Sequence, residues 1–325
     1  MPVAPDSGSS GPGAFSITVV VSAYTLDRWH VLEENIASLL RQTLPAEQVI
    51  LVIDHNDELL QRAREAFPQI EVLASEGERG ASAARNLAIR QARGDIIACI
   101  DDDAVAVDKW LEELTAPYVD PDVLGTSGMP EPRWVNGEAP SWLPFEFYWT
   151  IGCGYGGLPT TVAQIRNPIG ASMSLRRIVF ERVGEFSSGF GPNMSKPGPH
   201  GGGEETELAI RAAKEFPHGK IVHVPEAKVE HVVSAERTTW RYYLNRCRLE
   251  GRMKALLVQE HGSMEGLSSE RTYTLRTLPR GVLRGLGDAL RGDLSGLQRA
   301  AAIVAGLAYT AAGYGFGRAR QLLRP

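Results

Sequence analysis

The stretch Asp95-Ile-Ile-Ala-Cys-Ile100 is followed directly by three carboxylates, Asp101-Asp102-Asp103. A run of β-branched and small apolar residues that ends in acids predicts a buried strand whose carboxyl end opens onto a site. Because carboxylates this close together repel one another, we expect a cation beside them. A divalent metal that carries a diphosphate fits this need. The simpler interpretation is an acidic turn in which Asp108 caps the helix that follows.

The sequence before these acids alternates between two patterns. Apolar runs typical of strands alternate with stretches that have helical periodicity. We predict strands near 15–21, 49–54 and 70–74, and helices near 30–42, 58–66 and 81–92. This spacing predicts βαβ units and a parallel sheet, in which ligands bind beyond the carboxyl ends of the strands. Asp54, Arg79, Gly80 and the three aspartates all map to that edge.

Several motifs, in their order and spacing, resemble those of family 2 glycosyltransferases with the GT-A fold. The resemblance extends over about residues 15 to 260. The matching stretches are Ile17-Thr-Val-Val-Val-Ser-Ala-Tyr24, Leu40-Arg-Gln-Thr-Leu-Pro45, Ile50-Leu-Val-Ile-Asp54, Gly80-Ala-Ser-Ala-Ala-Arg-Asn86, Ile100-Asp-Asp-Asp103, Asn167-Pro-Ile-Gly-Ala-Ser-Met-Ser-Leu-Arg176, Gly203-Glu-Glu-Thr-Glu-Leu208 and Val229-Glu-His231.

The resemblance implies an α/β fold with a Rossmann-like, mostly parallel sheet flanked by helices. It also implies inverting transfer of a sugar from a nucleotide-diphosphate sugar, with a UDP-sugar favoured, to an acceptor hydroxyl. The acceptor would be a glycan or a lipid-linked molecule, and the cofactor would be Mg²⁺ or Mn²⁺, which suit carboxylate and diphosphate oxygens.

The resemblance also assigns a set of residues to the donor and the metal. Asp101 would face the ribose, and Asp103 and His231 would hold the metal. Asp54 has a simpler interpretation as a helix cap, Arg85 as a surface ion pair, and His231 as a structural histidine. The residues assigned to the nucleotide-sugar are Ser22, Tyr24, Asp54, Gly80, Arg85, Asp101, Asp102, Gly170 and Ala171.

A catalytic base is expected where glycines lead into a helix rich in acids, at Gly201-Gly-Gly-Glu-Glu-Thr-Glu207. Helical periodicity places Glu205 on the same stripe as Leu208, whereas Glu204 shares a face with Arg211. We expect Glu204 to contact the acceptor. An acid on an apolar stripe should point into a cleft, where burial raises its pKa toward that of a useful base. The family pattern here is Glu-Asp, so Glu205 is one methylene longer. First-turn acids also complement a helix dipole without any catalytic role.

Acceptor contacts are expected from aromatic side chains between the two halves of the site. Trp142 and Trp149 belong to a cluster of seven aromatic residues within residues 134–155, and aromatic faces stack on sugar rings. Core packing is the alternative for most of this cluster. Arg246, in a basic helical stretch, could approach an acceptor phosphate or remain solvated.

Length and composition suit one large domain with an extension. The chain has 325 residues, and its 43% hydrophobic content supports a sizeable core. Residues 1–14 are rich in Pro, Gly and Ser, which predicts a disordered tail rather than a signal peptide. We expect a GT-A domain at 15–235, with its nucleotide half at 15–103 and its acceptor half at 104–235. A basic helical extension would occupy 236–325.

The charge distribution suggests where this extension binds. Residues 236–325 hold 15 Lys and Arg against 7 Asp and Glu, although the whole chain has a net charge of −5. Residues 300–317 contain no charged side chain, so they could span a membrane, lie in its interface or pack as an ordinary helix. We expect an anionic membrane surface as partner, at the inner face of the plasma membrane. Nucleic acid is not expected, because no nucleic-acid-binding motif accompanies the charge.

Three scattered cysteines match no metal spacing and indicate a reducing, cytoplasmic compartment. Two other functions remain open from the sequence alone. A nucleotidyltransferase that makes an activated sugar normally has a Gly-rich phosphate loop and a Lys near the first strand, and Ser22-Ala-Tyr-Thr25 has neither. A non-catalytic protein that binds a sugar-nucleotide or glycan would keep donor affinity without turnover.

Overall fold

The computed structural model describes residues 15–190, 202–262 and 272–322. The tail predicted at 1–14 lies outside the described residues, as does most of the Gly- and Pro-rich stretch 189–203, for which the sequence predicts a mobile loop. The helices and strands predicted from residue 15 to the three aspartates are all present, within two residues of their expected ends.

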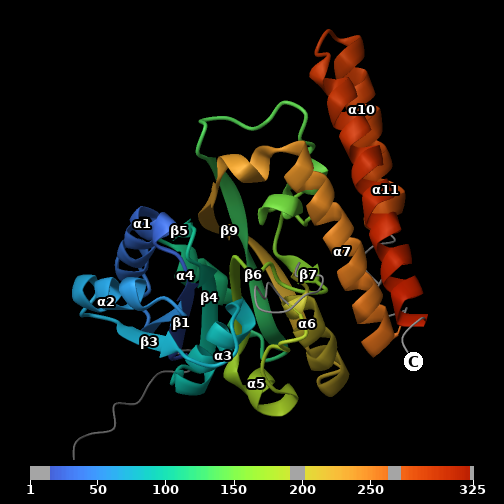
Figure 1. Ribbon diagram of the computed structural model, residues 1–325. Coiled ribbons are helices and arrows are strands. Elements are labelled where there is room, and N and C mark those ends of the chain that lie inside the picture. Colours follow the sequence, from blue (N-terminus) through green and yellow to red (C-terminus); the bar gives the residue numbers. More distant parts are fainter. Residues whose placement is uncertain (1–14, 191–201, 263–271, 323–325) are drawn as a thin grey trace, which may run out of the picture.

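The described elements follow one another along the chain in an alternating order (Figure 1). They are β1 (Ile17–Ala23), η1 (Leu26–Arg28), α1 (Trp29–Leu40), β2 (Gln48–Asp54), α2 (Asp57–Ala66), β3 (Glu71–Ser75), α3 (Ala81–Gln91), β4 (Ile96–Asp101), β5 (Ala104–Ala106), α4 (Trp110–Thr115), η2 (Ala116–Val119), β6 (Val123–Trp134), η3 (Phe145–Ile151), β7 (Ala163–Ile165), β8 (Ser172–Arg176), α5 (Arg177–Val183), α6 (Glu204–Glu215), β9 (Lys220–Val233), η4 (Ala235–Thr238), α7 (Trp240–His261), η5 (Tyr273–Thr277), α10 (Leu278–Leu290) and α11 (Ser295–Leu322).

The strands form one sheet in the order β3-β2-β1-β4-β8-β6-β9-β5, with β7 paired to β9. The first four positions are parallel, as the βαβ pattern predicts. Beyond β4 the sheet is mixed, because β8 is antiparallel to both β4 and β6, whereas β6 and β9 are parallel. The predicted α/β fold is confirmed, and its parallel part coincides with the predicted nucleotide half.

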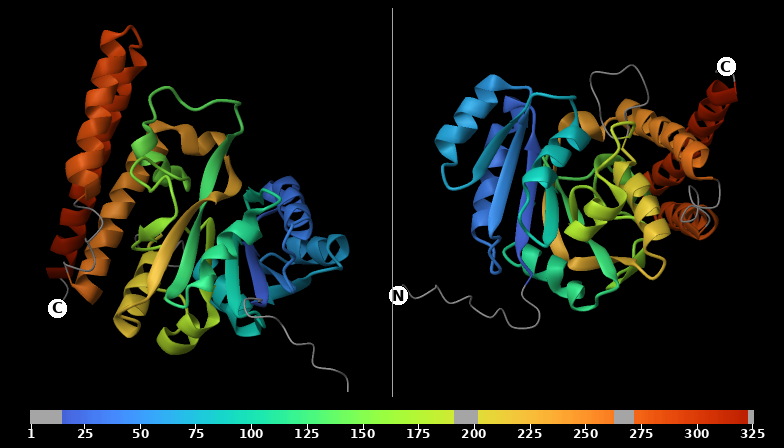
Figure 2. Two further views of the ribbon diagram at one scale, coloured as in Figure 1. Left: turned by 180° about the vertical axis from the view of Figure 1, so that it is seen from behind. Right: turned by 90° about the horizontal axis from the view of Figure 1, so that it is seen from below.

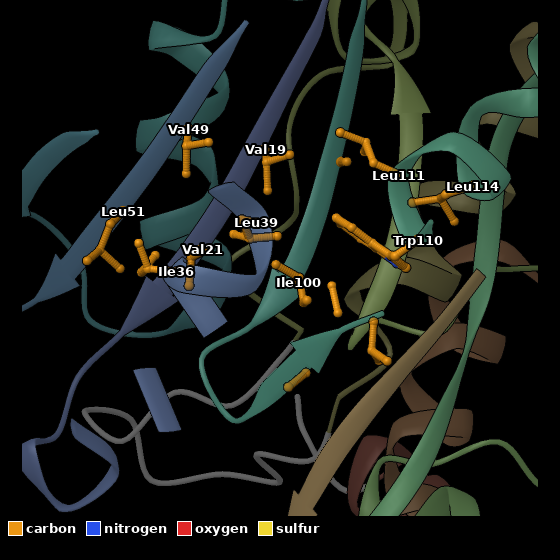
Figure 3. Packing of buried hydrophobic residues seen from close by; sticks show 14 of the residues in the cluster. Val19, Val21, Ile36, Leu39, Val49, Leu51, Ile100, Trp110, Leu111 and Leu114 are labelled. Carbon is orange, nitrogen blue, oxygen red and sulfur yellow. The ribbon is translucent and has the colours of Figure 1, made fainter. Parts of the chain in front are cut away.

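Each face of the sheet has its own hydrophobic core. One core packs β1, β2 and β4 against α1 and α4, and its Trp110 side chain is fully buried. The Trp110 indole donates a hydrogen bond to the Ser172 hydroxyl at 2.8 Å, which satisfies its polar edge inside the core. The second core packs the opposite face against α3, α5 and α6. Figure 3 shows members of the first core: Val19, Val21, Ile36, Leu39, Val49, Leu51, Ile100, Trp110, Leu111 and Leu114.

The C-terminal helices α10 and α11 lie on the outer side of α7, and α11 also contacts η3. In Figures 1 and 2, α10 and α11 run side by side, and the turn that joins them projects beyond the sheet. A third core joins Phe147 and Val233 to Tyr243, Leu278 and Ile303, so it extends across the predicted boundary at residues 235 and 236. That boundary therefore separates two sequence segments that share one packed core.

The uncharged segment 300–317 is part of α11. Among the described residues, α11 is the one helix long and apolar enough to cross a membrane, judged by length and composition. Only 28% of its apolar window is buried in the protein. Most of this surface is therefore left for solvent or for a partner.

Candidate active site

The carboxyl ends of three neighbouring strands meet at one edge of the sheet. Ser22 lies near the end of β1, and Asp54 and Asp101 are the last residues of β2 and β4. This edge opens into a cavity of about 1340 Å³. The cavity is lined by most of the predicted site residues, namely Ser22, Tyr24, Asp54, Gly80, Arg85, Asp101, Asp102, Asp103, Trp149, Gly170, Ala171, Glu204, Glu205, His231 and Arg246.

Asp54 is held between two loops. Its Oδ2 accepts a hydrogen bond from the backbone N–H of Gly80 at 2.9 Å, and its Oδ1 lies 2.7 Å from Nδ1 of His55. Gly80 has a φ of 123°, which a residue with a side chain rarely adopts. The cap of α2 is Asn56, whose side chain accepts from the N–H of Leu59. The helix-cap interpretation of Asp54 is therefore wrong, and its carboxylate remains at the cavity.

Arg85 binds three carboxylates at the centre of the site. Its Nη2 lies 2.8 Å from Asp101, and its Nη1 lies 3.3 Å from Glu204 and 3.4 Å from Glu205. Its side chain is only 6% exposed, so the surface ion-pair interpretation of Arg85 is wrong. A buried guanidinium among these acids holds β4 and α6 together at the cavity.

The first turn of α6 enters the protein interior with both glutamates. Glu205 lines the cavity as predicted, but Glu204 is also buried, and its Oε2 has no hydrogen-bond partner among the described residues. The prediction that only Glu205 of this pair points inward is therefore wrong. Periodicity misses this because the N-terminal end of α6, rather than one of its faces, points into the fold.

Glu205 has the electrostatic environment of a base. Burial, together with the neighbouring Glu204 carboxylate, raises the pKa of Glu205 to about 8, although Arg85 opposes the shift. Its Oε1 lies over Gly170, where any Cβ would collide with the carboxylate. The sequence resemblance assigns Gly170 to the nucleotide-sugar. In the structure the group closest to this position is the Glu205 side chain.

Asp101, Asp103 and His231 form a donor set for a metal ion. Their ligand atoms all lie within 4.8 Å of one another, and Nε2 of His231 is 3.2 Å from Oδ1 of Asp103. Burial alone would lower the pKa of His231, but the Asp103 carboxylate outweighs it and raises this pKa to about 10. Two carboxylates and an imidazole are ligands that Mn²⁺ accepts, and Mg²⁺ favours the oxygens. The residues thus fit the predicted divalent cation.

Two arginines that the sequence analysis missed complete the acidic cluster. Arg28, in η1, lies 2.7 Å from Asp102 and 3.0 Å from Asp103, and Arg237, in η4, lies 3.1 Å from Asp103. Burial of Asp103 is outweighed by His231, Arg237 and Arg28, which hold its pKa well below the usual range. The sequence did carry a signal for Arg28, because this residue follows β1 by a few positions and so falls at the same edge of the sheet as the aspartates.

The pKa of Asp102 shifts in the opposite direction to that of Asp103. Burial raises the pKa of Asp102 to about 7, against the opposing charge of Arg28. Asp108 does not cap the following helix, as the simpler interpretation of the acidic turn proposed. The N-cap position of α4 is Lys109.

The predicted acceptor residues separate in the structure. Trp149 and Arg246 line the cavity, and the Trp149 indole donates to the Tyr273 hydroxyl at 3.0 Å. Trp142 instead stacks on Trp240 with ring centroids 4.5 Å apart, in the core that joins the extension to the sheet. Trp142 therefore does not line the cavity, and core packing, the alternative stated above, accounts for its position.

The chain is similar to glycosyltransferases in sequence and in structure. It is 29% identical over 245 residues to the glucosyl-dolichyl phosphate glucuronosyltransferase of Haloferax volcanii, an alignment that covers 74% of this chain and 77% of the relative. The mannosyltransferase PcManGT from Pyrobaculum calidifontis, solved with GDP-Man and Mn²⁺, matches with a TM-score of 0.61 and 16% identity, over 94% of this chain and 90% of that one.

A second solved structure, GalNAc-T7 with UDP, GalNAc and Mn²⁺, matches with a TM-score of 0.53 and 16% identity, over 80% of this chain and 53% of that one. These two likenesses show a shared fold and confirm the predicted GT-A architecture. A model of the family described as glycosyl transferase family 2 matches residues 18–184, which include the first four strands and the three aspartates. The chain therefore belongs to glycosyl transferase family 2 and is a glycosyltransferase.

Proposed function

We propose that the chain transfers a sugar from a nucleotide-diphosphate sugar to a hydroxyl group of a lipid-linked acceptor, with inversion at the transferred carbon. The observation that carries this proposal is the position of Glu205. It shares one cavity with the Asp101, Asp103 and His231 donor set, and it contacts Arg85, which also binds Asp101. Donor-binding and proton-accepting groups thus lie side by side.

The nucleotide would occupy the parallel half of the site. Ser22, Asp54 and Gly80 line the cavity at the ends and loops of β1, β2 and β3, where open sheets bind their ligands. We propose a UDP-sugar as donor. A bound Mg²⁺ or Mn²⁺ would neutralise the negative charge of the leaving diphosphate. Asp101, Asp103 and His231 would hold this ion.

The acceptor hydroxyl would approach Glu205 from the side of Trp149 and Arg246. Glu205 would take the hydroxyl proton during a single displacement, and a raised pKa makes its carboxylate a stronger base than an exposed glutamate. A single base and direct attack on the anomeric carbon invert its configuration. The alternative of a nucleotidyltransferase gains no support, because the family of the chain is that of glycosyltransferases.

A lipid-linked acceptor has two supports. The Haloferax volcanii relative is a glucosyl-dolichyl phosphate glucuronosyltransferase, and the cavity continues from Arg246 to the apolar helix α11. We place the reaction at the cytoplasmic face of the plasma membrane. In support, Cys99, Cys153 and Cys247 are free and buried, which suits a reducing compartment.

A donor screen tests this function. The melting temperature of the full chain is measured with UDP-sugars and GDP-sugars, in Mn²⁺ and in EDTA. We expect stabilisation by one nucleotide class in Mn²⁺ only, with release of the nucleoside diphosphate when the acceptor is added. Stabilisation without any turnover on lipid-phosphate sugars would favour a non-catalytic binding protein instead.

A further inference from the structure

The hairpin formed by α10 and α11 exposes leucines in a regular pattern. On α10, Leu283, Leu286 and Leu290 are 67%, 42% and 90% exposed. Their spacing of three and four residues places them on one face of the helix. The buried residues of α10 are Leu278, Gly281 and Gly285. The leucines therefore point away from the protein.

Exposed apolar side chains also occur in the turn and at the start of α11. Leu294, Leu297 and Val304 are 70%, 49% and 59% exposed. The buried residues at this end of α11 are Gly296, Ala300, Ala302 and Ile303, and Gly296 packs directly on Gly285 of α10. The hairpin thus exposes large apolar side chains on both helices, although Leu278 and Ile303 are buried. We call Leu283, Leu286, Leu290, Leu294 and Leu297 the leucine face.

Arginines flank the leucine face. Arg280 and Arg284 of α10 are four residues apart and so share one face of the helix, Arg276 lies in η5 just before α10, and Arg291 lies in the turn with 80% of its side chain exposed. Arg284 bonds to Glu146, whereas Arg276 and Arg280 are exposed. An apolar face with a basic margin is typical of a helix that lies in the interface of an anionic membrane.

Close packing between helices argues against α11 leaving the protein to span a membrane. A Cβ at Gly251 of α7 would collide with the carbonyl oxygen of Thr310, and a Cβ at Gly313 with that of Arg248. The two helix backbones therefore touch along the second half of α11. Insertion of residues 300–317 as a span would break this contact, whereas docking through the leucine face leaves it intact.

We propose that the leucine face rests in the surface of an anionic lipid bilayer, and that this contact brings the active-site cavity to its lipid-linked acceptor. The inference rests on the proposed function and adds the docking surface. Leu307, Thr310, Ala311 and Tyr314 of α11 line the active-site cavity. The helix that would contact the bilayer thus also forms a wall of the site.

Vesicle flotation of the full chain tests the proposal. The chain is mixed with vesicles of equimolar phosphatidylglycerol and phosphatidylcholine, or of phosphatidylcholine alone, at low salt. We expect flotation with the anionic vesicles, and a loss of at least about tenfold when Leu286→Asp and Leu290→Asp are combined, because charged side chains are expelled from the bilayer. The matched control combines Leu44→Asp and Val119→Asp, two exposed positions on other elements, and should float like the unchanged chain.

Two further measurements complete the design. Arg276→Gln with Arg280→Gln should weaken flotation on anionic vesicles severalfold, and raised salt should do the same. Equal flotation of the leucine and control variants would overturn the proposal, as would absence of flotation of the unchanged chain. Membrane association that resists extraction with alkaline carbonate would also overturn the proposal and would indicate a membrane-spanning helix.

Stabilisation by UDP or GDP in Mn²⁺ is measured on the same samples. The leucine variant should keep the stabilisation that the unchanged chain shows, because its substitutions lie outside the cavity lining. If stabilisation persists and flotation fails, the docking surface alone is wrong. If the unchanged chain floats but neither nucleotide stabilises it, the proposed function is wrong and the docking surface stands.

Discussion

Oδ1 of Asp103 lies 3.2 Å from Nε2 of His231, although the two residues belong to distant parts of the chain. The sheet brings them together, because Ala104 of β5 pairs with His231 of β9 and the N–H of Val232 donates to the carbonyl of Asp103 at 2.8 Å. A short antiparallel ladder thus sets the geometry of the metal donors. The same ladder lies beside Gly152, whose missing side chain leaves room for the His231 ring.

Replacement of Glu205 tests the assignment of the base. Glu205→Gln should lower kcat by about 10² or more, because the amide cannot accept the hydroxyl proton. Donor affinity should change less, since the nucleotide would lie on the other side of Arg85. Glu204→Gln is the matched comparison, and we expect a smaller loss of kcat. Equal losses, or a larger loss for Glu204→Gln, would show that the two roles are reversed.

The pH profile of kcat should report the same group. Burial and Glu204 raise the pKa of Glu205 to about 8, so its basic form is populated only as the pH rises through that value. We therefore expect kcat to increase with pH across this region. The residual kcat of Glu205→Gln should not show this increase with pH. A rate that is flat between about pH 6 and pH 9 would contradict a base of raised pKa.

The same shift predicts how stability depends on pH. Because the folded pKa of Glu205 exceeds its unfolded value, the folded state binds more protons between the two values, and the contribution of Glu205 to stability falls as the pH rises through this window. Glu205→Gln removes this cost. Its gain in free energy of unfolding should be larger at about pH 9 than at about pH 5, by urea denaturation at both pH values. A gain that does not depend on pH would exclude this linkage.

Gly170→Ala tests the contact between Gly170, which lies just before β8, and the Glu205 side chain. The added methyl group would collide with the Glu205 carboxylate and must displace it from its place beside Arg85. We expect a fall in kcat of about tenfold or more, since small misplacements of catalytic groups are costly. Gly77→Ala is the control, because nothing lies within 4 Å of its added Cβ. Unchanged kinetics in Gly170→Ala would mean that Glu205 is not held there in solution.

Removal of Arg28 tests the buried acidic cluster. Asp102 is 4% exposed and lies 2.7 Å from Arg28, so Arg28→Gln leaves a buried carboxylate without its cation. We expect a loss of about 3 kcal/mol in the free energy of unfolding in EDTA. Burial already raises the folded pKa of Asp102 to about 7, so this acid is largely protonated at low pH. The loss should therefore shrink between about pH 8 and pH 5.

The sequence predicts the nucleotide half of the fold better than the remainder. Alternating strands and helices before Asp101 carry a strong local pattern, and local patterns determine βαβ units. The order of β8, β6, β9 and β5 depends on pairing between distant segments, which no periodicity encodes. The position of Trp142 was missed for the same reason, because its partner Trp240 lies in another part of the chain.

The site shows the same division between local and distant information. Asp54 and Asp101 end their strands as predicted, Asp103 follows in the turn after β4, and strand ends are readable from the sequence. The burial of Glu204 and the arginine contacts at Asp102 and Asp103 depend on how α6, η1 and η4 dock onto the sheet. Sequence reasoning could assign residue types to the site, but it could not assign which charges face which.

The most direct test of the account is calorimetric titration of UDP and GDP into the full chain, in Mn²⁺ and in EDTA, for the unchanged chain and for Asp103→Asn. We expect nucleotide binding that requires Mn²⁺ and a loss of at least about tenfold in affinity for Asp103→Asn, because one charged metal ligand is gone. Lys109→Gln serves as the control. Lys109 is exposed and lies shortly after β5, so this variant should bind nucleotide like the unchanged chain. Nucleotide binding of equal strength in EDTA, or in Asp103→Asn with Mn²⁺, would contradict the assignment of Asp101, Asp103 and His231 as the metal site.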